Sequence, residues 1–191
     1  MIANVLNLKA IVAATALTVT FSLPSVASAQ GATPPNEAEL LSELSQADPL
    51  DANAIERELQ ALWGKSGSPA MDLLLKRGIQ ALERGETSVA IEHLTALTDH
   101  APGFARGWYE RARAYFVAGL YGPSVADLEH ALALNPNDYD AIFALGTIFE
   151  QFRDPKNAYE AYLRAKAIHP NHEEVTKALD RLAPLVEGKE L

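Results

Sequence analysis

The stretch ALALNPNDYDAIFALG, residues 131–146, decides the fold, because two runs that favour helix are separated by a break at Asn135-Pro136. The same break recurs along the chain, since 136 − 102 = 34 and 170 − 136 = 34 residues separate Pro102, Pro136 and Pro170. Proline cannot continue a helix, so each of these positions predicts the end of one unit and the start of the next. A fixed period of this length indicates an array of structural repeats.

The period defines three units, 71–104, 105–138 and 139–172, in each of which the proline is the thirty-second residue. Residues of one type recur at the same place in each unit, and apolar residues at helical spacing predict two helices per unit. Small residues at fixed places indicate where these helices come close. The matching sets are Leu74, Trp108 and Ile142; Gly78, Ala112 and Gly146; Ala90, Ser124 and Ala158; and Leu94, Leu128 and Tyr162.

This pattern resembles the tetratricopeptide repeat (TPR) family, whose 34-residue helix-turn-helix units carry large apolar, small and proline residues at these offsets. The resemblance covers residues 71–172. It implies an all-α fold, a TPR α-solenoid forming a right-handed superhelix of three helix-turn-helix repeats. Arg77 and Arg111 stand where the family has leucine, and Ala81 replaces an aromatic residue. We therefore expect looser packing in the first two units.

Capping helices are expected at both ends of the array, because stacked repeats leave their outermost apolar faces uncovered. The segment 51–70 is predicted to be a covering helix and loop that packs on the first unit, and 173–191 a capping helix and tail. Residues 30–50 are expected to be a flexible leader with a possible short helix. The apolar residues at helical spacing are Ile55, Leu59, Leu62 and Trp63 in the first capping segment and Val175, Leu179 and Leu182 in the second.

The residues that favour turns and helix caps stand at positions that fit the same 34-residue units. Gly85 and Gly119, one period apart, stand where the first helix of a unit must end and the chain turn back. Asp154, which precedes a proline, predicts an N-cap. Asn137 and Asn171 are predicted to open the helices that follow them.

Residues 1–29 have the features of a secretory signal peptide: Lys9, an apolar run over 10–23, and small residues ending at Ala29. The run is shorter than the roughly 20 apolar residues that cross a bilayer, which favours cleavage after Ala29 over retention as an inner-membrane anchor. We therefore expect a periplasmic or secreted protein with no stable membrane insertion after cleavage. An uncleaved, anchored form is the alternative.

Composition narrows the possible partners. The formal charge of the chain is −9, and removing Lys9 with the signal makes it −9 − 1 = −10. Nucleic-acid binding requires clustered cations, so nucleic acid is not an expected partner. The chain has no cysteine and so no disulfide, and packing alone must hold the fold.

Enzyme signatures are missing from the sequence. It contains no glycine-rich phosphate loop, no G-x-S-x-G elbow and no cysteine nucleophile. His169 and His172 flank a turn proline and lack the spacing of helical metal ligands. We therefore predict no catalysis, no metal site and no cofactor. The surplus of carboxylates leaves one alternative of another class, a metal-dependent or acidic-surface enzyme accessory.

The family resemblance implies that the first helices of the units form a concave face that binds a partner protein or peptide. The apolar and aromatic groups beside two arginines suit a peptide with hydrophobic anchors and a carboxylate. The residues predicted to bind are Leu75, Ile79, Arg106, Tyr109, Arg113, Phe116, Phe143 and Glu150.

One known binding mode of the family is not expected here. Some members clamp a terminal carboxylate with basic and amide side chains, but the equivalent positions hold Leu75, Ile79, Asp140 and Ala144. The predicted role is a non-catalytic exported scaffold in cell-envelope assembly or in a secretion or maturation complex. The sequence identifies neither the partner nor the oligomeric state.

Overall fold

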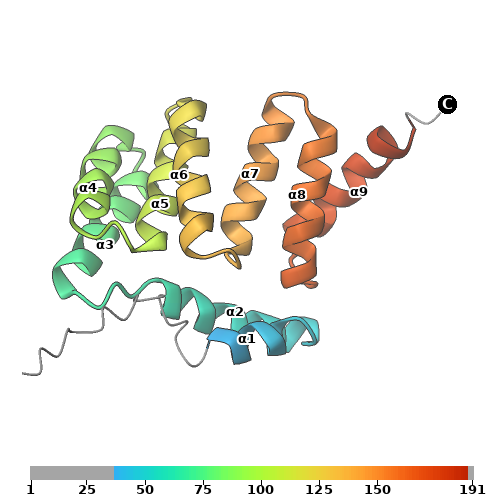
Figure 1. Ribbon diagram of the computed structural model, residues 1–191, viewed down its shortest axis with the longest axis horizontal. Coiled ribbons are helices and arrows are strands. Elements are labelled where there is room, and N and C mark those ends of the chain that lie inside the picture. Colours follow the sequence, from blue (N-terminus) through green and yellow to red (C-terminus); the bar gives the residue numbers. More distant parts are fainter. Residues whose placement is uncertain (1–36, 189–191) are drawn as a thin grey trace, which may run out of the picture. The chain divides into compact units, whose positions relative to one another are not determined.

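The computed structural model describes residues 37–188, which form nine helices and contain no strand (Figure 1). The all-α repeat fold expected from the 34-residue period is confirmed. None of the described helices is long and apolar enough to cross a membrane. The predicted signal peptide, residues 1–29, lies outside the described residues. The helices are α1 (Glu37–Leu44), α2 (Pro49–Trp63), α3 (Pro69–Glu83), α4 (Thr87–His100), α5 (Ala105–Val117), α6 (Tyr121–Leu134), α7 (Tyr139–Gln151), α8 (Pro155–Ile168) and α9 (Glu173–Glu187).

Three helix pairs, α3–α4, α5–α6 and α7–α8, stand side by side in chain order, and α9 packs against α8 (Figure 1). A tight turn joins the two helices of each pair. Gly85 and Gly119 adopt φ of 75° and 73° in these turns, the left-handed region that glycine enters at little cost. In the third pair Arg153 takes the same place with φ of 59°.

Small residues allow the paired helices to approach closely, as the sequence predicted. A Cβ atom added at Gly78 would overlap the Leu94 side chain, and one added at Gly146 would overlap the Tyr162 ring. In the second pair the Ser124 hydroxyl donates a hydrogen bond of 2.8 Å to the Ala112 carbonyl across the same interface. In the first and third pairs a large side chain therefore fills the space beside a glycine, and in the second pair a hydrogen bond joins two small residues.

The loose packing expected at Arg111 is not observed. Its guanidinium lies over the Trp108 ring, 4.8 Å from the centroid, and donates a hydrogen bond of 2.8 Å to the Thr98 hydroxyl. It also forms an ion pair with Asp127 of α6. The arginine thus fills the place of the usual leucine, because its charge finds a partner on the neighbouring helix.

Two helix starts differ from prediction by one residue. The N-cap of α7 is Asp138, whose carboxylate accepts from the Ala141 amide, and that of α9 is His172. The predicted opening residues therefore lie in the preceding turns. Asn171 instead donates a hydrogen bond of 2.7 Å to the Ala47 carbonyl. The predicted cap Asp154 is confirmed, since its carboxylate accepts from the Asn157 amide.

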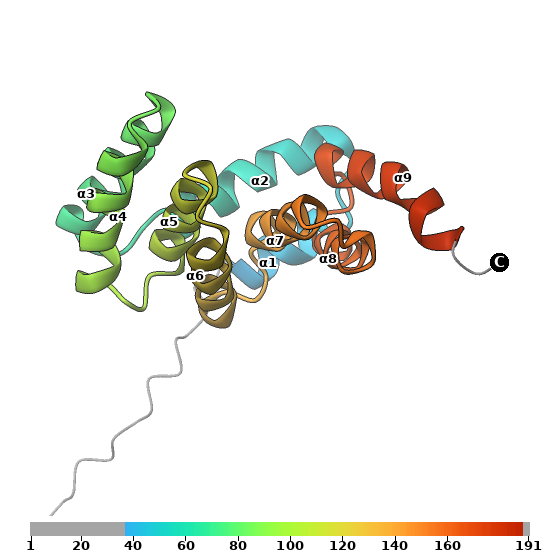
Figure 2. The ribbon, with the colours of Figure 1, turned by 90° about the horizontal axis from the view of Figure 1, so that it is seen from above.

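Helix α2 does not cover the first unit as expected, because its side chains contact the third. The Trp63 and Tyr139 rings lie 5.4 Å apart, and Gln60 donates a hydrogen bond of 2.6 Å to Asp140. Leu59 is fully buried in the same cluster as Tyr139. Figures 1 and 2 show α2 passing beside α7 before the chain continues to α3. The apolar face of α2 is covered by aromatic residues that are distant in sequence. Helical periodicity shows that a helix has an apolar face, but not which residues cover it.

Candidate functional site

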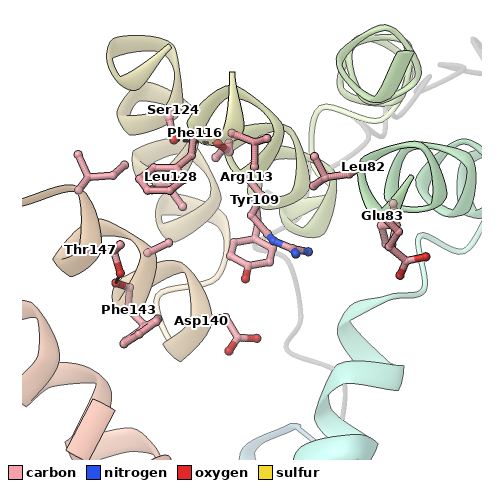
Figure 3. A pocket seen from close by; sticks show the side chains of 15 residues that line it. Leu82, Glu83, Tyr109, Arg113, Phe116, Ser124, Leu128, Asp140, Phe143 and Thr147 are labelled. Atoms are coloured by element: carbon pink, nitrogen blue, oxygen red, sulfur yellow. Dashed lines mark hydrogen bonds between the residues drawn. The ribbon is translucent and has the colours of Figure 1, made fainter. Parts of the chain in front are cut away.

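A cavity of about 440 Å³ opens on the side of the array formed by the first helices of the three pairs (Figure 3). Helix α3 packs directly against α5, whereas the cavity lies between α5 and α7 and reaches the side chains of Ser124 and Leu128 on α6. Most of the residues that line the cavity therefore belong to the second and third units. Its apolar lining includes Ile79, Leu82, Phe116, Val117, Phe143 and Ile148.

Five of the eight residues predicted to bind a partner line this cavity: Ile79, Tyr109, Arg113, Phe116 and Phe143. They come from α3, α5 and α7, and Figure 3 shows the Tyr109, Arg113 and Phe143 side chains around one space. Their convergence follows from the repeat, because equivalent positions of successive first helices face the same side. Their role in binding stays a prediction.

The other three predicted residues lie outside the cavity lining. Leu75 is only 5% exposed and belongs to the core between α3 and α4. Glu150 accepts hydrogen bonds from the Tyr162 hydroxyl at 2.7 Å and from Arg181 of α9 at 2.7 Å. Arg106 donates a hydrogen bond of 2.7 Å to the side-chain oxygen of Gln60 on α2.

Both groove arginines are paired with Glu110, a carboxylate that is fully buried on α5. Arg113 Nη1 donates to Glu110 Oε2 at 2.6 Å, and Arg106 Nη2 lies 2.9 Å from Glu110 Oε1 without the alignment of a hydrogen bond. Each guanidinium also lies over the Tyr109 ring, at 4.7 Å for Arg106 and 5.9 Å for Arg113. Both arginines thus pair with an internal acid, which offsets part of the positive charge that the sequence had suggested for binding a ligand carboxylate, while the Arg113 side chain remains 44% exposed.

Sequence reasoning missed Glu110 as a member of the site. Its spacing, four residues after Arg106 and three before Arg113, places all three on one side of a helix and could have indicated the pairing. Its burial could not have been predicted, because it depends on how α5 packs in the array. Burying one carboxylate between two cations is favourable only when the partners are held in good geometry.

Two further acids lie at the start of α7, at one end of the cavity. Burial raises the pKa of Asp138 to about 6, with a further contribution from the neighbouring Asp140. Asp140 lines the cavity, accepts from Gln60 and lies 3.8 Å from Arg106. Burial and the charge of Asp140 also raise the pKa of the Tyr109 phenol, which keeps the phenol neutral.

Two histidines lie beside these acids, where α8 ends and α9 begins. Burial lowers the pKa of both His169 and His172, so both imidazoles are neutral near pH 7. His169 Nε2 lies 3.6 Å from Glu56 of α2, and the His172 ring stacks on Phe143 at 5.5 Å. Among residues 37–188 no group of three or more histidines and acids could hold a metal ion.

Comparison with known sequences identifies the array. A family model described as tetratricopeptide repeat matches residues 75–122 and 124–173, which together are more than half of the chain. The chain belongs to the tetratricopeptide repeat family. A TPR repeat-containing protein of Rhizobium etli is 28% identical over 151 residues, covering 78% of this chain and 74% of its own length. Superkiller complex protein 3 of Mus musculus is 32% identical over 116 residues, covering 60% of this chain and 7% of its own length.

Solved structures, two of them TPR domains, share the fold. The Sgt2 TPR domain from Aspergillus fumigatus has a TM-score of 0.59 and 28% identity, with 63% of this chain and 81% of that domain covered. The first TPR of Spaghetti (RPAP3), bound to the HSP90 peptide SRMEEVD, has a TM-score of 0.60 and 24% identity, covering 63% and 95%. MamA has a TM-score of 0.57 and 23% identity, covering 77% and 83%.

Proposed function

We propose that this TPR protein is a non-catalytic scaffold that binds a segment of a partner protein in the cavity between its second and third units. The observation that carries the proposal is the cavity itself. Three first helices contribute apolar and aromatic side chains to one open space of about 440 Å³, a volume in the range of ligand-binding pockets. The same fold holds a bound peptide in the RPAP3 domain.

The exposed apolar residues at the rim of the cavity support this function. Val117 lines the cavity and is 60% exposed, and Phe152, at the end of α7, is 62% exposed. The Tyr121 ring lies edge-on between Phe116 and Phe152, with both centroid distances 5.5 Å. An apolar surface continuous with a pocket is characteristic of a protein-binding site. Large aromatic residues at such a site supply most of the binding energy.

Site-specific photo-crosslinking in the native cell would test the proposed surface. A photoreactive amino acid in place of Val117 should yield discrete crosslinked products, and Ala144→Trp, which fills the cavity, should abolish them. The same amino acid in place of Leu163, which is 47% exposed on α8 and outside the cavity lining, is the matched control. Equal products from both positions, or products unaffected by Ala144→Trp, would show that the groove is not the binding site.

We further propose that the protein is exported and that its partner belongs to the cell envelope, in an assembly, secretion or maturation complex. The support is the signal-like pattern of residues 1–29. Intact-mass measurement of the native protein would test it. A mass lacking residues 1–29 would agree with export and cleavage, whereas a full-length mass in the membrane fraction would support the anchored alternative.

A further inference from the structure

We infer that the cavity selects a partner segment in which a large apolar residue is flanked by lysine or arginine, and that it rejects acidic segments. The inference rests on the proposed function and specifies its ligand class. The two groove arginines by themselves would favour an acidic segment, but both pair with a buried carboxylate, and the acids around the cavity outnumber them.

The charged groups around the cavity sum to a negative value. Arg106 and Arg113 contribute +2, whereas three acids contribute −3, so the formal sum is +2 − 3 = −1; the acids are Glu83, Glu110 and Asp140. The nearby histidines are neutral and do not offset this charge. A cleft with apolar walls strengthens the field of the charges at its edge, so a cation is attracted and an anion repelled.

Glu83 is the acid best placed to meet a ligand. It lies at the end of α3, lines the cavity and is exposed, and Figure 3 shows its carboxylate at one side of the cavity, opposite Phe143. It forms no ion pair or hydrogen bond within residues 37–188, since the adjacent Arg84 pairs with Glu86 at 2.7 Å. A lysine or arginine on the ligand would therefore complete an ion pair that the fold leaves open.

Most of the apolar lining of the cavity comes from α5, α6 and α7. Leu128 and Ile148 are buried side chains of this lining, and Ala144 beside them in the lining carries only a methyl group. A leucine- or phenylalanine-sized side chain of the ligand would leave water by entering this space, which favours binding. A segment inserting such a residue between the second and third units would carry its flanking residues past Asp140 on one side and toward Glu83 on the other (Figure 3).

An acidic segment would meet repulsion at both ends. Its carboxylates would approach Glu83 and Asp140, while Arg113 already donates to Glu110 at 2.6 Å. The charge of Arg113 is partly offset by this buried carboxylate, so Arg113 attracts a ligand carboxylate less strongly than an unpaired arginine would. Like-charge contact is the usual means of excluding wrong partners, so the same groups that attract a cation also provide specificity.

Selection from a random peptide library displayed on phage, with the purified protein as bait, tests the inference. Peptides recovered by wild type but not by Ala144→Trp should contain a large apolar residue with lysine or arginine within a few positions. For one such peptide, Glu83→Gln should weaken binding roughly threefold at low salt, and the difference should shrink as salt rises. Glu160→Gln, an exposed acid on α8, is the matched control and should bind like wild type.

The outcomes separate this inference from the function on which it rests. Pocket-dependent peptides enriched in aspartate or glutamate, or with no charge preference, would overturn the charge selection and leave the binding groove standing. Recovery of the same peptides by wild type and by Ala144→Trp would show that the cavity is not the binding site. Equal affinity of the Glu83→Gln protein and wild type for a basic peptide would also contradict the inference.

Discussion

The guanidinium of Arg111 and the carboxylate of Asp127 form two parallel hydrogen bonds, from Nε to Oδ2 at 2.7 Å and from Nη2 to Oδ1 at 2.9 Å. Asp127 is 6% exposed, so this pair joins α5 to α6 within the second repeat where the family ordinarily packs leucine. A buried pair of this kind is stabilising only while both partners are present.

Arg111→Leu alone should therefore destabilise the fold, although it restores the usual family residue. The variant leaves Asp127 buried without its cation, and we expect a loss of roughly 3 kcal/mol in the free energy of unfolding. The double variant Arg111→Leu/Asp127→Leu should recover most of that loss. Urea denaturation of the single and double variants gives the coupling energy. Additive losses would contradict the assigned pair.

Gly146→Ala should destabilise the third repeat, because the added methyl group would overlap the Tyr162 ring. We expect a cost of roughly 1–3 kcal/mol, typical of overpacking in a closed interface. Gly122→Ala is the matched control, since a Cβ there meets no atom within 4 Å and its φ is not in the left-handed region. The control should be neutral or slightly stabilising in thermal unfolding. Similar losses in both variants would show that the close approach at Gly146 does not limit side-chain size.

Arg153→Gly should raise the stability of the third repeat. Arg153 holds φ of 59°, where the two preceding units use glycine, and relief of that conformation should outweigh the flexibility of glycine by roughly 0.5–1 kcal/mol. The converse change, Gly119→Ala, places a side chain at φ of 73° and should lower the melting temperature. A drop in melting temperature for Arg153→Gly would mean that its side chain contributes more than the backbone strain costs.

Asp138→Asn tests the buried N-cap of α7 through its pH dependence. Burial raises the pKa of Asp138 from 3.8 to about 6, so the folded state binds this proton more tightly than the unfolded state. The contribution of this group to stability is therefore largest below the unfolded pKa and is lost as pH rises to about 6. Asparagine retains an acceptor for the Ala141 amide and carries no charge.

The stability of the Asp138→Asn variant relative to wild type should thus rise by roughly 1–3 kcal/mol between about pH 4 and pH 7. Urea denaturation across this range measures it. His169 and His172 have lowered pKa values, so their contribution to the stability of the fold is lost as pH falls. This contribution is present in both proteins and cancels when the variant is compared with wild type. Asp154→Asn, at an exposed cap, controls for the change in capping. A pH-independent difference would mean that the Asp138 carboxyl titrates alike in both states.

Gln60→Ala should loosen α2 from the third repeat. The Gln60 amide donates to Asp140 at 2.6 Å and its carbonyl oxygen accepts from Arg106 at 2.7 Å, so one side chain joins α2 to both α5 and α7. We expect amide hydrogen exchange in α2 to accelerate roughly tenfold. Asn53→Ala, which removes only a local hydrogen bond to Pro49 on the same helix, should change exchange little. Equal acceleration in both variants would show that the hydrogen bonds of Gln60 to α5 and α7 do not hold α2 in place.

The repeat architecture and the location of the groove could be predicted from sequence. The recurring proline gave the period, and the small residue at the eighth position of each unit indicated the close helix contact seen at Gly146. Five of the eight predicted partner-binding residues line one cavity, because a fixed period presents equivalent residues on one side. The remaining three are occupied by internal contacts. Glu150, for example, is held by Arg181, 31 residues further along the chain.

Local pattern alone determined which residues form helices, where the chain turns and which sides of the helices face inward, since these properties arise from interactions within a few residues. Tertiary structure decided that α2 packs beside α7, that Asp127 pairs with Arg111 and that the buried Glu110 pairs with both groove arginines. Burial and charge balance are properties of the space around a side chain, and that space exists only when residues distant in sequence come together.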